Sequence, residues 1–125
     1  MNVEIFANRS NPAIQNLLDK AGDGLNMYFD ANNNMVDIDY YLFIYLPCEL
    51  TNKHIPPTLP KLVDYSNKHP DKTIFCFAQE QEVVQITAHQ LKSIRAVGKL
   101  VEDNGARWLT QLPASLHSLF ECRGA

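Results

Sequence analysis

The stretch that decides the fold reads Asp-Ile-Asp-Tyr-Tyr-Leu-Phe-Ile-Tyr-Leu and spans Asp37–Leu46. Its second half is continuously apolar, which is typical of a strand buried on both faces of a parallel sheet. Pro47 ends the run, because proline has no N–H to donate to a sheet. Side chains alternate along a strand, so Tyr41, Phe43 and Tyr45 share one face, where we expect most of them to pack in the core.

Strand-like and helix-like segments alternate on either side of this stretch. Short apolar runs predict further strands at Val3–Ala7, Leu25–Phe29, Lys72–Ala78 and Ala106–Leu109. Apolar residues at helical spacing predict helices that start at Asn11-Pro12, near Leu59, near Thr87 and after Leu112-Pro113. Strands that alternate with helices pair in parallel and carry helices on both faces. We therefore expect an α/β fold, an open three-layer sandwich around a mostly parallel five-stranded sheet.

The bulk composition is that of one globular domain. The chain has 125 residues, of which 46% are hydrophobic and 20% charged, and we expect a single domain over residues 1–125. A formal net charge of -3 without a long basic run gives nucleic-acid binding little support. The longest apolar run, Tyr40–Pro47, is far shorter than the roughly 20 residues of a membrane span. With no signal peptide evident, we expect a cytoplasmic protein without a membrane partner.

Metal and cofactor motifs are absent from the sequence. The cysteines Cys48, Cys76 and Cys122 are widely spaced, which favours reduced thiols, with Cys76 packed inside a strand. The four histidines are scattered, whereas a zinc site needs several ligands that converge. No glycine-rich phosphate loop follows the first strand. We expect neither a metal nor a cofactor.

Two later segments carry a more specific signal. Val63–Lys72 reads Val-Asp-Tyr-Ser-Asn-Lys-His-Pro-Asp-Lys, and Ala96–Gly105 reads Ala-Val-Gly-Lys-Leu-Val-Glu-Asp-Asn-Gly. Together with the strand that follows Asp39, they resemble the nucleoside 2-deoxyribosyltransferase family, in particular its short members. The resemblance covers most of the chain, and the N-terminal part matches in pattern only.

The resemblance implies a fold, an activity and a set of site residues. The family has a flavodoxin-like parallel sheet and transfers 2-deoxyribose between bases through a glutamate that attacks the anomeric carbon. Its strand-end aspartate falls on Asp39, and its first-strand ligand contacts fall on Phe6 and Asn8. Tyr65 is a further candidate contact to a ligand. Family members assemble so that a neighbouring chain completes the pocket, so a homo-oligomer is implied.

One position departs from the family pattern. Where the family has its nucleophilic glutamate, this chain has Lys61. An ammonium group cannot act as a carboxylate nucleophile, and it repels the positive charge that develops on the sugar. It can instead pair with a phosphate as a point charge. Asp64, one helical turn further on, and Glu49, in the loop after the proline, are then the remaining candidates for a catalytic carboxylate.

Three functions follow from this pattern. The first is a protein that binds a nucleoside or nucleotide-like small molecule while its transferase chemistry is impaired by Lys61. The second is an active N-deoxyribosyltransferase or nucleoside hydrolase that uses Asp64 or Glu49. The third is a structural or interaction domain without a ligand. In an open α/β sheet a small molecule binds beyond the carboxyl ends of the strands, so we expect the site at that edge.

Structural roles are the alternatives for the same residues. Asp39 can be a turn residue at the start of its strand, and Lys61 and Asp64 can belong to a solvated helix face. The basic residues of the penultimate helix are expected on an exposed face; they are Lys92, Arg95 and Lys99.

Overall fold

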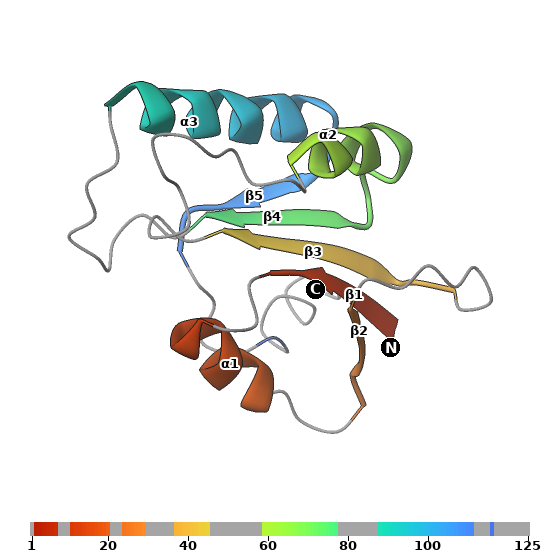
Figure 1. Cartoon of the computed structure of the whole chain (residues 1–125). Coiled ribbons are helices and arrows are strands. Elements are labelled where there is room, and N and C mark those ends of the chain that lie inside the picture. The colour runs from red at the N-terminus through yellow and green to blue at the C-terminus, as the bar shows by residue number, and fades with distance from the viewer. Residues whose placement is uncertain are drawn as a thin grey trace.

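A computed structural model of the chain describes residues 2–7, 11–20, 24–29, 37–45, 59–77, 88–111 and 116. Strands and helices alternate along this part of the chain (Figure 1). Their order is β1 (Asn2–Phe6), α1 (Pro12–Asp19), β2 (Asn26–Phe29), β3 (Tyr40–Tyr45), α2 (Leu59–Lys68), β4 (Thr73–Phe77), α3 (Ala88–Asp103) and β5 (Arg107–Leu109).

The strands form one sheet in the order β2-β1-β3-β4-β5. Every pairing within it is parallel. The register sets Glu4 beside Tyr28 on one side and Tyr41 on the other, and sets Phe6 beside Phe43. This is the flavodoxin-like strand order. The expected α/β class is confirmed, with a sheet that is fully rather than mostly parallel.

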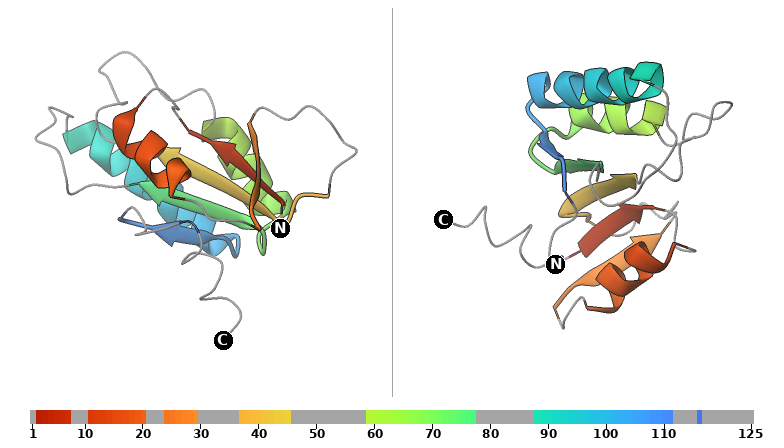
Figure 2. Two further views of the ribbon diagram at one scale, coloured as in Figure 1. Left: turned by 90° about the horizontal axis from the view of Figure 1, so that it is seen from below. Right: turned by 90° about the vertical axis from the view of Figure 1, so that its left-hand side faces the viewer.

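Helices cover both faces of the sheet, which gives three layers. Figure 2 shows α2 and α3 side by side on one face and α1 on the other. On the α1 face the buried cluster consists of Val3, Ile5, Ile14, Leu17, Leu42, Ile44, Ile74, Cys76 and Leu116. On the α2–α3 face it consists of Phe6, Phe43, Tyr45, Leu59, Leu62, Phe75, Phe77, Ile94, Val101 and Ala106. Each large side chain buried in this way stabilises the fold by about 1.5–3 kcal/mol.

Local chemistry sets the helix ends. The Asn11 side chain accepts a hydrogen bond of 2.9 Å from the Ala13 N–H, and Pro12 occupies the first turn of α1, as expected for an N-cap followed by proline. After α3, Gly105 adopts a φ of 101°, a left-handed conformation that glycine reaches without a steric penalty. The first feature confirms the predicted start of α1, and the second ends α3.

The contact between α3 and β5 depends on a second glycine. Gly98 is buried in the middle of α3, and the indole ring of Trp108 on β5 occupies the space where a larger residue would place its Cβ. The helix backbone therefore lies directly against the ring. Glycine costs about 1 kcal/mol in a helix interior relative to alanine, and this close approach is its physical reason here.

The sequence located the elements well and their bounds less well. The run Asp37–Leu46 predicts a longer strand than the observed β3. The observed strand starts later because pairing with β1 begins only at Tyr40, opposite Val3. The predicted last helix lies outside the described residues apart from Leu116, which is helical and buried. No helix within the described ranges is long and apolar enough to cross a membrane.

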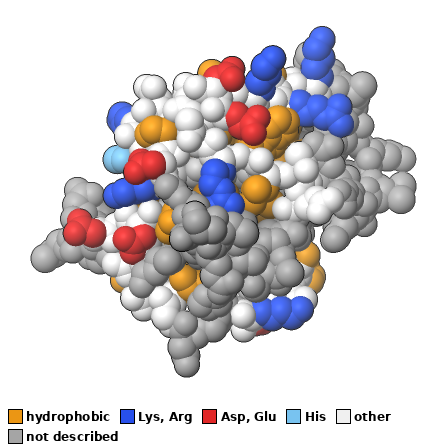
Figure 3. Space-filling model, turned by 180° about the vertical axis from the view of Figure 1, so that it is seen from behind, with side chains coloured by type: hydrophobic (Ala, Val, Ile, Leu, Met, Phe, Trp, Pro, Cys, Tyr) orange, Lys and Arg blue, Asp and Glu red, His pale blue; other side chains and the backbone are white. Residues whose placement is uncertain are grey.

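The surface carries charges of both signs. Figure 3 shows acidic and basic side chains interspersed over the back of the molecule. On α3 the predicted basic face is exposed as expected, and Glu102 and Asp103 are exposed near its end. Neutralising a nucleic-acid backbone needs a basic patch, and this mixture of charges does not provide one on α3.

Candidate ligand-binding site

The strand order creates one point where the chain leaves the sheet in two directions. From the end of β1 the chain passes to α1 on one face, and from the end of the adjacent β3 it passes to α2 on the other. In sheets of this kind, ligands bind beyond the carboxyl ends of the two strands at which the direction reverses. The carboxyl ends of β1 and β3 are therefore the candidate binding site.

Helix α2 places a cation at this edge. It runs opposite to the strands, so its first turn lies near their carboxyl ends and its last turn near their amino ends (Figure 1). Lys61, in the first turn, is exposed, and its Nζ lies 5.2 Å from the centroid of the Phe6 ring. Phe6 ends β1 and stacks on Phe43 of β3 at 4.3 Å between ring centroids. The ammonium group thus lies within the range of a cation–π contact.

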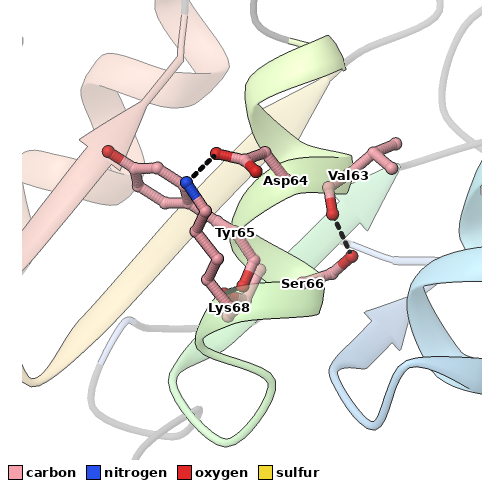
Figure 4. A network of polar contacts seen from close by, with 6 residues as sticks. Val63, Asp64, Tyr65, Ser66 and Lys68 are labelled. Carbon is pink, nitrogen blue, oxygen red and sulfur yellow. Dashed lines mark hydrogen bonds and ion pairs between the residues drawn. The ribbon is translucent and has the colours of Figure 1, made fainter.

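Tyr65 lies one turn further along α2, and its ring packs against side chains of both β1 and β3. Its ring meets Phe6 and Phe43 edge-on, each at 5.9 Å between centroids, and lies 4.7 Å from the ring of Tyr41. Figure 4 shows Tyr65 extending away from the helix axis toward these strands. His69, just after α2, stacks on Tyr41 at 5.3 Å. Lys61 and Tyr65, both candidate ligand contacts, are therefore brought together with Phe6.

A buried carboxylate that sequence reasoning missed lies in the same place. Glu4 is only 5% exposed and belongs to the same face of β1 as Phe6, because the two residues are separated by one position. Burial raises the pKa of both Tyr41 and Tyr65, and the negative charge of Glu4 is the second cause for each. The pKa of Tyr65 is raised further by the charges of Tyr41 and Asp64. Both hydroxyls therefore stay protonated at neutral pH. The signal for Glu4 was present in the sequence, as one acid inside the apolar run Val3–Ala7.

Asp64 does not point into this cluster of side chains. It is exposed on α2, where its Oδ2 lies 3.2 Å from the Nζ of Lys68 in an i,i+4 ion pair (Figure 4). An exposed helical pair of this kind contributes only about 0.3–0.5 kcal/mol. Lys61 and Asp64 thus both occupy the solvated face that the sequence offered as their structural alternative.

Asp39 lies at the opposite edge of the sheet. The Asn2 N–H donates to its Oδ2 at 2.7 Å, and its own N–H donates to the Asn2 carbonyl at 2.8 Å. The 6 residues of β3 separate it from the carboxyl end, a distance of roughly 20 Å at the usual rise of a strand. The structure therefore does not bring Asp39 together with Lys61. Its contacts hold the beginnings of β1 and β3 side by side.

Three residues considered in the sequence analysis remain, namely Asn8, Glu49 and Cys76. Asn8 and Glu49 lie outside the described residues. Cys76 is buried in β4, as predicted, and burial raises the pKa of its thiol to about 12, which leaves it unreactive. Within the described ranges, no group of three or more His, Cys, Asp or Glu side chains could hold a metal ion.

Comparison with known proteins gives no match. No family model, no curated protein and no solved structure matches this chain. The fold and the geometry of the site are therefore the observations on which a function can be argued.

Proposed function

We propose that the carboxyl ends of β1 and β3, together with α2, bind a nucleoside or nucleotide-like small molecule, and that Lys61 impairs transferase chemistry there. The observation that carries the proposal is the position of Lys61, whose Nζ lies over the Phe6 ring at the point where the chain leaves the sheet in two directions. Open α/β sheets bind ligands at this point.

The charge at this point supports binding rather than sugar transfer. An exposed ammonium attracts an anionic group of a ligand and pairs with phosphate as a point charge. The same ammonium disfavours the positive charge that develops on a sugar when its bond to the base breaks. The half-buried ring of Tyr65 adds an aromatic surface beside the cation, against which a planar base can pack.

The test is calorimetric titration with matched pairs of nucleosides and their 5′-monophosphates. We expect each nucleotide to bind about tenfold more tightly than its nucleoside, which is about 1.4 kcal/mol. Lys61→Ala should remove this difference. Lys99→Ala is the matched control, because Lys99 is also exposed on a helix of the same face but lies on α3. Absence of binding below millimolar concentration across the panel would refute the proposal.

Catalysis is tested in the same samples. Incubation with a deoxynucleoside and a second free base, followed by chromatography, should show no exchange of the base. Exchange that is lost in Asp64→Ala or Glu49→Ala would instead establish an enzyme that works without a carboxylate at position 61. A homo-oligomer is part of the proposal, and light scattering that gives the mass of one chain would remove that part alone.

A further inference from the structure

The outward side of α3 carries an ordered row of charges. Four exposed residues lie on one ridge of the helix, because they are spaced at i, i+4, i+7 and i+11; they are Lys92, Ala96, Lys99 and Asp103. This ridge lies opposite the side on which α3 packs against the sheet, and α3 belongs to the outermost layer of the molecule (Figure 1). We define these four residues as the α3 ridge, a surface that a partner can reach.

The charges of α3 oppose the dipole of their own helix. Acids stabilise the start of a helix and bases stabilise its end. Helix α3 has no acid in its first turn and no base in its last turn, and Glu102 and Asp103 instead occupy the last turn. Lys99 and Asp103 are also an i,i+4 pair in the less favourable order, with the base first. This pattern is therefore unfavourable within a single chain.

Contacts inside the described part of the chain do not compensate these charges. None of the charged residues of the α3 ridge, and likewise not Glu102, forms an ion pair with another described residue. On α2, by contrast, Asp64 and Lys68 are paired at 3.2 Å in the favourable order, with the acid first. The pair on α2 is thus satisfied within one chain, whereas the α3 ridge is not.

The α3 ridge is complementary in charge to a second copy of itself. Lys92 and Asp103 lie at equal distances on either side of its midpoint, as do Ala96 and Lys99. When two such helices lie antiparallel about a twofold axis, each Lys92 faces Asp103 of the other copy. The small Ala96 then leaves room for the aliphatic stem of Lys99. A parallel arrangement would instead set Lys92 against Lys92, so the charges select the antiparallel one.

We propose that two copies of this chain associate through an antiparallel contact between their α3 ridges, in which Lys92 of each copy pairs with Asp103 of the other. The contact gives an interface to the homo-oligomer of the proposed function, and it does not depend on a ligand. It lies over β4 and β5, whereas the candidate ligand-binding site lies at β1 and β3. Each copy therefore keeps a binding site of its own.

The size of α3 sets the strength of this contact. The helix has 16 residues, which is about 24 Å of length. One helix of this length presents less surface than a standard interface of about 1,600 Å² requires, so the association is weak. We expect a dissociation constant on the order of 0.1 mM. The chain is then monomeric at the low micromolar concentrations of spectroscopic unfolding experiments.

Sedimentation equilibrium on the full chain tests the contact by charge reversal. Lys92→Glu and Asp103→Lys each set like charges against one another at both ends of the contact, so each variant alone should dimerise about tenfold or more weakly than the wild type. An equimolar mixture of the two variants should associate about as tightly as the wild type, because opposite charges then face each other at both ends.

The matched control is Lys20→Glu, because Lys20 is exposed at the end of α1 on the other face of the sheet. It changes the net charge as Lys92→Glu does and should leave the dissociation constant unchanged. Both ridge variants should fold, since Asp103→Lys places a base in the last turn of α3, where the helix dipole favours it. Circular dichroism establishes this before the masses are interpreted.

Each other outcome overturns the inference. A wild-type chain that stays monomeric up to about 1 mM at low salt, where attraction between exposed charges is strongest, leaves no contact to explain. A dimer that neither charge reversal weakens forms through another surface, and the homo-oligomer of the proposed function then stands without the α3 contact. Variants that do not associate on mixing exclude the antiparallel pairing. Ligand binding is measured separately by calorimetry and is not affected by these results.

Discussion

Replacing Gly98 with alanine should destabilise the protein, although alanine is the better helix former. An ideal Cβ at position 98 would lie 2.7 Å from Cζ2 of Trp108 and still closer to Cε2 and Cδ2 of the same ring. Real Cβ atoms do not approach carbon this closely, so the indole or the whole of α3 must move. The indole has little room to move, because Trp108 packs against the buried cluster between α3 and the sheet.

Two opposing terms set the size of the effect. Alanine gains about 1 kcal/mol over glycine from helix propensity in the middle of α3. Inserting a methyl group into a close-packed site costs about 1–3 kcal/mol, and more where the neighbour is rigid. Since the overlap involves three atoms of a rigid ring, we expect the packing cost to exceed the gain. Gly98→Ala should lose on the order of 1–2 kcal/mol of unfolding free energy.

Urea denaturation followed by circular dichroism measures both terms in one double-mutant cycle. In a Trp108→Leu background, where the ring is gone, Gly98→Ala should instead gain up to about 1 kcal/mol. The two backgrounds should thus differ by about 2–3 kcal/mol. Ala96→Gly, at an exposed position of α3, reports the propensity term alone. If Gly98→Ala is neutral or stabilising in the wild-type background, the packing argument is wrong.

Three further predictions concern single groups, each measured by urea denaturation. Asn11→Ala should cost about 1 kcal/mol through loss of the N-cap bond, while Asn16→Ala, exposed within α1, should not. The Thr73 hydroxyl donates to the carbonyls of His69 at 2.8 Å and Tyr65 at 3.2 Å, so Thr73→Val should cost about 1–2 kcal/mol and Thr73→Ser much less. Burial raises the pKa of Cys76 from 9.0 to about 12, so its contribution to stability is complete below pH 9 and lost as the pH rises toward 12. Between pH 7 and about pH 10.5, the unfolding free energy of the wild type should fall by about 2 kcal/mol more than that of Cys76→Ala. Equal losses in the two proteins would contradict this.

The sequence predicted the fold because its central strands, β3 and β4, are largely buried on both faces. Short, continuous apolar runs such as Thr73–Phe77 and Tyr40–Tyr45 are typical of strands at the centre of a parallel sheet. The predicted shared face of Tyr41, Phe43 and Tyr45 is confirmed, because the period of two along a strand depends only on backbone geometry. Strand bounds were less predictable, because they depend on where a neighbouring strand begins.

The site was only partly predictable, because it depends on which edge of the sheet each residue reaches. Phe6, Lys61 and Tyr65 were singled out from the sequence and lie together in the structure. Asp39 precedes its strand, so the direction of β3 places it at the amino edge, far from them. Glu4 was missed because an acid within a short apolar strand has no recognisable spacing to a partner, and Tyr41 and Tyr65 approach it only through tertiary packing.

The position of Trp108 allows the two halves of the sheet to be followed separately by optical spectroscopy. It is the single tryptophan of the chain, and β5 is separated from β1 by β3 and β4, roughly 14 Å across the sheet. Its fluorescence should therefore follow the docking of α3 on β5 and change little when a ligand binds at the opposite half. Tyrosine absorbance, to which Tyr41 and Tyr65 contribute, should respond to the ligand instead, so one unlabelled sample can report folding and binding independently.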